Sequence, residues 1–334
     1  MNHEKYERYL RGRGIPEQSI EKQMAVVGDW CRFLESTGGQ DGQIAGKAEA
    51  EIFARRLIGE SRNTLENFSA LGDYAGWAGH RKLQVAWIEL MDCHNALEAL
   101  AAEIERRHGR ETREKIFAKP LPPLGADEKE RSVYTREITD RMARSISGEQ
   151  ARQAWFQVQH GIPAEDWRRS DAADREKFLQ SGSIDEFLAL KRRERDALLT
   201  RLRDEDKLWY TVKISDEVLE FVKSDPEMEG GRREGEKIFI TKIPYNAVRY
   251  LQETDLWMKR YYACHCPLVR QAILEDRPIS PEVCHCSLGH ASHYLAGIGL
   301  PYRGIVLESA VRGDLRCRFV FYPVTAEERQ GNAS

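Results

Sequence analysis

The spacing of apolar residues predicts helices over most of the first 206 residues. After Ser19, within the letters SIEKQMAVVGDWCRFLEST, apolar residues recur every three or four positions, as on the buried face of an amphipathic helix. The segment 61–79 predicts another helix that ends at its last glycine. The segment 82–109 (KLQVAWIELMDCHNALEALAAEIERRHG) predicts one long helix closed by a glycine. The charged segment 191–206 is typical of the solvated face of a further helix.

The pattern changes after residue 207, where short segments rich in aromatic and β-branched residues begin. LWYTVKIS (208–215) and KIFITKI (237–243) predict strands, with a helix stopped by Pro226 between them. GIVLESAV and LRCRFVFY flank the turn residues 312–314, which is typical of a β-hairpin. The expected fold class is therefore α+β: an all-helical N-terminal region followed by a small α+β metal-binding domain with a C-terminal β-hairpin.

The chain of 334 residues is too long for one ordinary core, so more than one domain is expected. The segment KPLPPLGADEKE (119–130) contains three prolines and a glycine and predicts a linker. The expected parts are a helical bundle domain at 1–118, a linker with further helices at 119–206, a cysteine-rich α+β domain at 207–325 and a disordered tail at 326–334.

Composition restricts the classes of function. The net charge is −3, which gives no support to nucleic-acid binding, although it leaves a local basic patch open. No apolar run approaches the roughly 18 residues of a membrane span, and the N-terminus lacks a signal-peptide core. We therefore expect a cytoplasmic protein that does not bind membranes. A homodimer stays open.

Cysteines are concentrated near the C-terminus. Five of the seven lie between residues 264 and 317, in two Cys-His-Cys triplets at 264–266 and 284–286 and a single later cysteine. Cys31 and Cys93 lie amid helical apolar spacing and are expected to be buried small hydrophobes. In a chain without a secretion signal, clustered cysteines indicate metal or redox chemistry before disulfides.

The triplets predict a metal site. In an extended segment, residues i and i+2 face the same side, so each triplet can present two sulfurs, and Pro267 favours an extended Cys266. Four thiolates suit one tetrahedral Zn²⁺, and less well an iron–sulfur cluster. The later cysteine can replace one ligand or remain a separate thiol. The candidate ligands are Cys264, Cys266, Cys284, Cys286 and Cys317.

Other residues near the triplets are candidates for chemistry. His265 and His285 should point away from their flanking cysteines, toward a substrate or into a supporting position. Glu308 is a candidate acid/base group, or it pairs with an arginine across the hairpin. Tyr261 and Tyr262 are candidate pocket residues. A helix is expected to begin after Cys286 and to favour a thiolate there through its dipole.

One segment carries a family resemblance. ESAVRGDLRCRFVFY (308–322) resembles the closing hairpin of the 4-vinyl reductase domain family, which includes relatives of L-2-amino-thiazoline-4-carboxylate hydrolase. The resemblance implies a small-molecule-binding fold with a cysteine-ligated zinc. Where sensory members have a second cysteine, this chain has Ser309. The matching positions are Glu308, Gly313, Asp314, Cys317 and Phe319.

Two further likenesses concern longer stretches. TKIPY, KRYYACHCP and the second Cys-His-Cys are similar to motifs of a group of uncharacterised bacterial Cys-X-Cys proteins. The N-terminal helices resemble the core-binding helical domain of tyrosine recombinases, but the chain has no His-X-X-Arg, so recombinase catalysis is rejected. Phosphate-binding glycine loops, the dinucleotide fingerprint, the nucleophile elbow and His-Glu-X-X-His are also absent from the sequence.

Two functions of different classes follow. The first is a zinc protein that binds or acts on a small molecule. In its catalytic form, this protein would be a hydrolase-like enzyme for a heterocyclic or sulfur-containing substrate. That form requires an open metal position. The second is a small-molecule or metal/redox sensor module, in which zinc only braces the pocket and the N-terminal helices contact DNA or protein.

Overall fold

The computed structural model describes residues 3–37 and 46–324 and has an α+β fold, 65% helical, with a small antiparallel sheet near its C-terminal end. The described chain forms two compact units. One comprises the residues up to His94 together with Pro122–Arg131, and the other comprises Asn95–Leu121 and the residues from Ser132 onward. The predicted disordered tail lies outside the described residues.

The division between the units differs from the boundaries expected at residues 118 and 206. It falls within the segment 82–109, which was expected to form one helix. That segment is interrupted at residues 92–95, where Cys93 has a positive φ of 54°. The apolar spacing continues across the break, because both helices bury an apolar face, so the pattern alone did not reveal it.

The first unit is an all-helical bundle with an aromatic core. Trp30 contacts Phe53 and Trp87 edge-on, both at 5.3 Å between ring centroids. Cys31 is buried in this core, as expected for a small hydrophobe. The helices are α1 (His3–Gly12), α2 (Glu17–Ser36), α3 (Lys47–Gly59), α4 (Leu65–Trp77) and α5 (Arg81–Met91).

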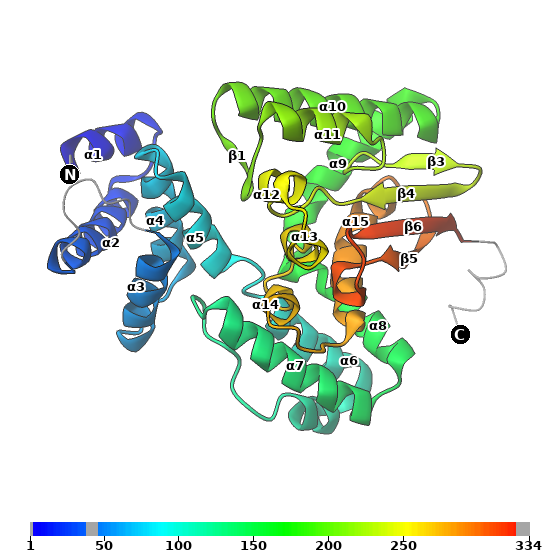
Figure 1. Ribbon diagram of the computed structural model, residues 1–334, viewed down its shortest axis with the longest axis horizontal. Helices are drawn as coiled ribbons and strands as arrows, with labels where there is room; N and C mark the ends of the chain where they lie inside the picture. The colour runs from blue at the N-terminus through cyan, green and yellow to red at the C-terminus, as the bar shows by residue number, and fades with distance from the viewer. Residues whose placement is uncertain (1–2, 38–45, 325–334) are drawn as a thin grey trace. The chain divides into compact units, whose positions relative to one another are not determined.

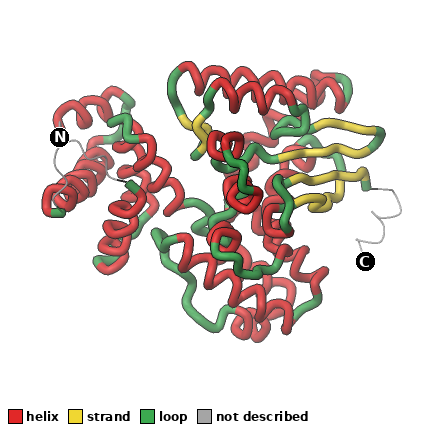
Figure 2. Tube along the Cα trace, viewed as in Figure 1, coloured by secondary structure: helices red, strands yellow, loops and turns green. Residues whose placement is uncertain are grey.

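The second unit combines helices with all the strands of the described chain (Figures 1 and 2). Its helices are α6 (Ala96–Ile116), α7 (Glu128–Ser145, whose first turn belongs to the other unit), α8 (Gly148–Val158), α9 (Ala164–Ser181), α10 (Ile184–Asp204), α11 (Asp216–Ser224), α12 (Ala247–Gln252), α13 (Leu256–Ala263), α14 (Arg270–Leu274) and α15 (His285–Gly297). Three short 3₁₀ turns are η1 (Gln159–Gly161), η2 (Pro281–Cys284) and η3 (Ala310–Arg312).

The strands form a four-stranded antiparallel sheet and a separate short ribbon. The four-stranded order is β3 (Arg232–Glu234), β4 (Lys237–Thr241), β6 (Arg318–Pro323) and β5 (Tyr302–Glu308). The ribbon pairs β1 (Leu208–Trp209) with β2 (Val212–Lys213), so the strand expected at 208–215 is instead a tight hairpin. The predicted C-terminal hairpin is confirmed, with Ile305 opposite Val320.

Helix α15 packs between the sheet and α8. Its Leu288 and Leu295 share a buried apolar cluster with Ile240 and Phe319 of the sheet. On the α8 side, the approach requires glycine, because a Cβ on Gly289 would lie 1.9 Å from the backbone oxygen of Phe156. This close contact determines where α15, and therefore the second cysteine triplet, lies.

Between β4 and the first triplet the chain forms two short helices, α12 and α13. The break lies at residues 253–255, where the Asp255 side chain accepts a hydrogen bond from the N–H of Trp257 and caps α13. Within the described residues, no helix combines the length and apolar character that a membrane span requires.

Candidate metal centre

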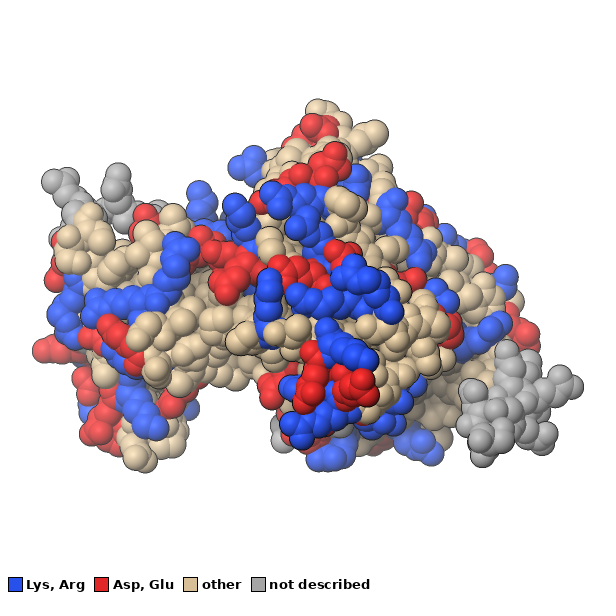
Figure 3. Space-filling view, turned by 90° about the horizontal axis from the view of Figure 1, so that it is seen from below, with Lys and Arg blue, Asp and Glu red and all other residues tan. Residues whose placement is uncertain are grey.

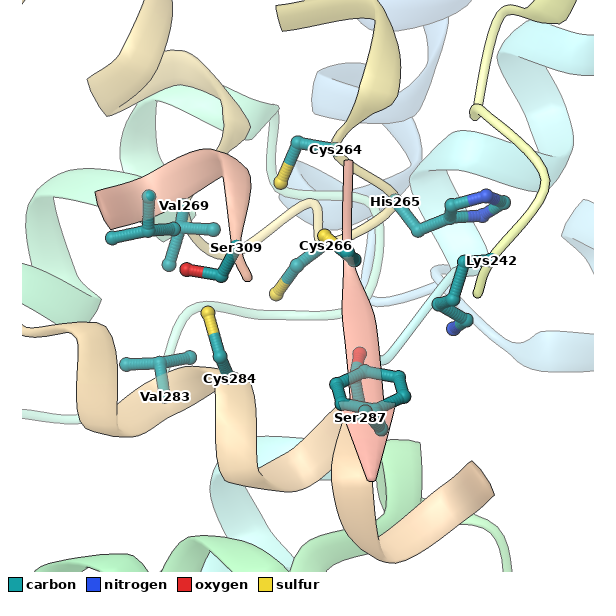
Figure 4. A pocket seen from close by; sticks show the side chains of 12 residues that line it. Lys242, Cys264, His265, Cys266, Val269, Val283, Cys284, Ser287 and Ser309 are labelled. Atoms are coloured by element: carbon teal, nitrogen blue, oxygen red, sulfur yellow. The ribbon is translucent and has the colours of Figure 1, made fainter. Parts of the chain in front are cut away.

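Four cysteines from three separate segments line one small cavity in the second unit. Cys264 and Cys266 come from the loop after α13, Cys284 from the end of η2, and Cys317 from the residue before β6. The cavity has a volume of about 20 Å³, which is room for one water-sized occupant. In Figure 4 the labelled cysteine sulfurs point into a common space, with the Ser309 hydroxyl beside them.

The first triplet has the extended geometry that the sequence predicted. Cys264 follows the last residue of α13 with φ −79° and ψ 119°, so the chain is extended there and the i and i+2 side chains both reach the cavity. The backbone N–H of Cys266 donates a hydrogen bond to the Cys264 sulfur. The backbone oxygen of Cys266 accepts from the N–H of Arg270 at 3.0 Å, which anchors the loop to α14.

The second triplet is helical, and this overturns the expectation that a helix begins only after Cys286. Cys284 ends η2, and α15 begins at His285. In a helix, residues two apart differ in direction by about 200°, so the two sulfurs diverge. Cys284 reaches the cavity. Cys286 does not line it, and its sulfur instead accepts a hydrogen bond from the backbone N–H of His160 at 3.1 Å.

Cys317 and Ser309 complete the lining from the hairpin. The Cys317 sulfur accepts a hydrogen bond from the backbone N–H of Ala310, and its carbonyl accepts from the N–H of Lys242 at 3.0 Å. Ser309 is fully buried, and its hydroxyl hydrogen-bonds the Cys284 sulfur.

Burial favours the protonated form of three cavity thiols, those of Cys264, Cys284 and Cys317. It raises the pKa of Cys264 well above its usual value, and neighbouring cysteines raise that pKa further. Burial also raises the pKa of Cys284 to about 12 and raises the pKa of Cys317. A bound divalent cation would instead favour the deprotonated thiolates, because coordinated thiols lose their protons.

Four cysteine thiols are chemically suitable ligands for a soft metal ion. Their sulfurs, however, are not arranged around a common metal position. Among residues 3–37 and 46–324, no group of three or more His, Cys, Asp or Glu side chains has the geometry to hold a metal ion. No disulfide joins any of the seven cysteines, all of which lie in the described chain. The four cavity thiols therefore lie close together without a disulfide between them.

The two triplet histidines each contact a backbone carbonyl. In Figure 4 the His265 ring points away from the sulfurs, and its Nε2 contacts the oxygen of Ile243. Burial and the charge of Lys242 lower the pKa of His265 to about 3, so the ring is neutral. His285 is buried, and its Nδ1 lies 3.1 Å from the oxygen of Glu282.

Glu308 forms the cross-hairpin ion pair that was the alternative to an acid/base role. Its two carboxylate oxygens accept from Nε and Nη2 of Arg316, both at 2.8 Å. The hydrogen bond from Arg316 lowers the pKa of Glu308, so the carboxylate stays ionised. Glu308 is not among the residues that line the cysteine cavity.

Tyr261 and Tyr262 do not line the cysteine cavity either. Both lie on α13, with their ring centroids 5.5 Å apart and their planes inclined at 61°. Tyr261 lies 5.9 Å from the guanidinium of the buried Arg270, so its visible role is in packing.

Sequence reasoning missed Lys242 and Ser287, which also line the cavity. Lys242 belongs to the TKIPY motif, which was noticed only as a likeness. Ser287 lies one residue beyond the second triplet, and its hydroxyl lies 3.5 Å from Nε2 of His160. Their proximity to the thiols depends on tertiary packing, so no spacing rule indicates it.

Comparisons with family models, with curated proteins and with solved structures found no match to this chain.

Proposed function

We propose that the protein binds one Zn²⁺ through Cys264, Cys266, Cys284 and Cys317, and that this ion braces a small-molecule-binding unit. The observation that carries the proposal is the convergence of four thiols from three segments on one cavity of about 20 Å³. Soft thiolates favour zinc, and four of them meet its tetrahedral preference. Binding would draw the sulfurs inward by side-chain rotation and release their protons.

The cavity size favours a single ion over an iron–sulfur cluster. A cluster of several iron and sulfide atoms needs more room than one water-sized occupant takes. Hydrogen-bond donors also suit thiolates, because the sulfurs of Cys264 and Cys317 accept backbone N–H groups.

A bracing role suits the donor set better than hydrolysis. Four thiolates fill the coordination sphere of zinc and leave no position for water, which a hydrolase of this kind requires. His265 is neutral and directed at a carbonyl, and Glu308 is held in an ion pair, so neither stands ready as an acid/base group. The three cysteine segments are far apart in sequence, so an ion joining them would stabilise the fold directly.

Nothing specific favours the DNA-contacting form of the sensor alternative. The net charge is −3, and on the face drawn in Figure 3 basic and acidic side chains are interspersed. A DNA-binding face would be expected to gather basic side chains.

The test is elemental analysis of protein purified under anaerobic conditions, with single Cys→Ser variants. We expect about one zinc per chain in the wild type. Cys284→Ser should lose most of the metal and lower the melting temperature. Cys286→Ser is the matched control, since it belongs to the same triplet but its sulfur is directed at His160. It should keep the metal.

Two outcomes would contradict the proposal. One is a wild-type protein that neither contains nor takes up zinc. The other is a Cys286→Ser variant that loses as much metal as Cys284→Ser. A zinc ion with three sulfur ligands and one oxygen ligand, seen by X-ray absorption spectroscopy, would instead favour the catalytic form.

A further inference from the structure

A second cavity of the same unit lies apart from the thiols. It is a cleft of about 570 Å³, in the size range of small-molecule sites. Its walls come from α6, α8, α15 and the edge strand β5. The apolar part of the lining includes Phe156, Leu288 and Ile305, and the polar part includes three arginines.

The three arginines come from three different elements and surround the apolar lining. Arg107 lies on α6, Arg152 on α8 and Arg303 on β5. Among the residues that the structure describes, the only carboxylate lining the cleft is that of Glu149, whose side chain is 62% exposed and pairs with Arg152. The described lining therefore holds three guanidinium groups and one carboxylate, while Glu103 and Glu282 beside the cleft pair with Arg107 and Arg152.

The local pairs leave donors available for a ligand. Arg107 donates through Nε to Glu103 and through Nη1 to Gln153, which uses two of the five N–H groups of its guanidinium. These pairs also hold the arginine in place, so little side-chain freedom is lost when a ligand binds. A guanidinium held in this way suits a planar carboxylate.

We propose that this cleft binds a small organic monocarboxylate with an apolar, ring-sized body. The apolar residues would cover the body, and the arginines would bind the carboxylate. A polyphosphate or nucleic acid fits less well, because Glu149 in the lining and Glu282 beside it, which pairs with Arg152, offset part of the positive charge.

The inference deepens the proposed function by naming the class of its small molecule, and it rests on the second unit being a ligand-binding fold. It does not require zinc in the cysteine cavity. Leu288 and His285, which line the cleft, are residues of α15, and α15 begins directly after Cys284. Loss of zinc would therefore act on the cleft only through the position of this helix.

Isothermal titration calorimetry of the full-length protein tests the proposal, with naphthaleneacetate as probe and neutral naphthaleneacetamide as its isostere. We expect saturable binding of the carboxylate and at least about tenfold weaker binding of the amide, as for loss of a charged hydrogen bond. Arg107→Gln should weaken carboxylate binding by a similar factor. Arg106→Gln is the matched control, because Arg106 pairs with the same Glu103 but does not line the cleft.

Absence of saturable binding up to about 10 mM carboxylate would overturn the proposal. So would equal affinity for acid and amide, or an equal effect of Arg106→Gln and Arg107→Gln. If Arg107→Gln does not fold, Arg303→Gln on β5 serves in its place. Zinc content is measured on the same samples. A zinc-free protein that binds the carboxylate disproves only the metal proposal, and a zinc-loaded protein that does not bind it disproves only this inference.

Discussion

The two Cys-His-Cys triplets have the same sequence but different structures. The first, at 264–266, is an extended loop after α13, and both of its cysteines line the cavity. The second, at 284–286, spans the end of η2 and the start of α15, and only its first cysteine lines the cavity. An extended chain repeats its side-chain direction every two residues, whereas a helix does not.

The difference teaches that a Cys-X-Cys spacing specifies a pair of ligands only once the backbone is known. The helical triplet supplies one thiol, and Cys317 from the hairpin takes the fourth place around the cavity. The central histidines differ in the same way. His265 contacts the oxygen of Ile243, far away in sequence, whereas His285 contacts the oxygen of Glu282 in the preceding turn.

The largest expected effect comes from moving the helix that carries the second triplet. In Gly289→Ala, the added Cβ would meet the backbone oxygen of Phe156 at 1.9 Å, and backbone cannot yield as a side chain can. We expect a loss of at least about 3 kcal/mol in the free energy of unfolding, measured by chemical denaturation.

Gly148→Ala on α8 is the control for this substitution. The nearest atom to a Cβ at position 148 is Nη1 of Arg152 at 3.8 Å, which is an ordinary contact. The free energy of unfolding of this variant should therefore be unchanged or slightly higher. If Gly289→Ala unfolds at the same denaturant concentration as the wild type, the close packing of α15 on α8 is wrong.

The next effect concerns β6, the strand that begins directly after Cys317. Glu227 is buried and bonds Nε and Nη2 of Arg318, the first residue of β6, at 2.7 and 2.9 Å. Although burial opposes it, the hydrogen bonds from Arg318 and Arg232 lower the pKa of Glu227 to about 2 from 4.5. The depressed pKa stabilises the fold above pH 4.5, and this stabilisation, about 2 to 3 kcal/mol, is lost as the pH falls toward 2.

Glu227→Gln should remove that pH dependence. The measurement is the free energy of unfolding of wild type and variant between pH 7 and about pH 2, with a chelator present so that metal release does not contribute. The free energies of unfolding of wild type and variant should differ at pH 7 and become similar at acidic pH. A constant separation across this range would show that the ion pair with Arg318 does not stabilise β6.

The smallest expected effect compares the two central histidines. His265→Phe keeps a ring but leaves the oxygen of Ile243 without its donor, at a loss of about 1 to 3 kcal/mol. His285→Phe breaks only a contact within one turn and should cost less, about 1 kcal/mol. Denaturation with a chelator present measures both. Equal losses would mean that the long-range contact of His265 does not hold the first triplet in place.

Local chemistry made part of the fold predictable. The stop of α11 before Pro226, the strand at β4 and the β5–β6 hairpin follow from proline geometry, β-branched composition and turn residues, which act over a few positions. The break between α5 and α6 was not predictable from apolar spacing, because the periodic pattern is the same on both sides of Cys93.

The sequence by itself determined that the chain is α+β, that its strands come late and that its thiols gather near the C-terminus. Only the tertiary structure decided which thiols share a cavity. Cys317 and Ser309 reach it because antiparallel pairing folds β6 back along β5, and Cys286 leaves it because α15 starts one residue after Cys284. Distances between such segments depend on packing, which residue spacing along the chain does not encode.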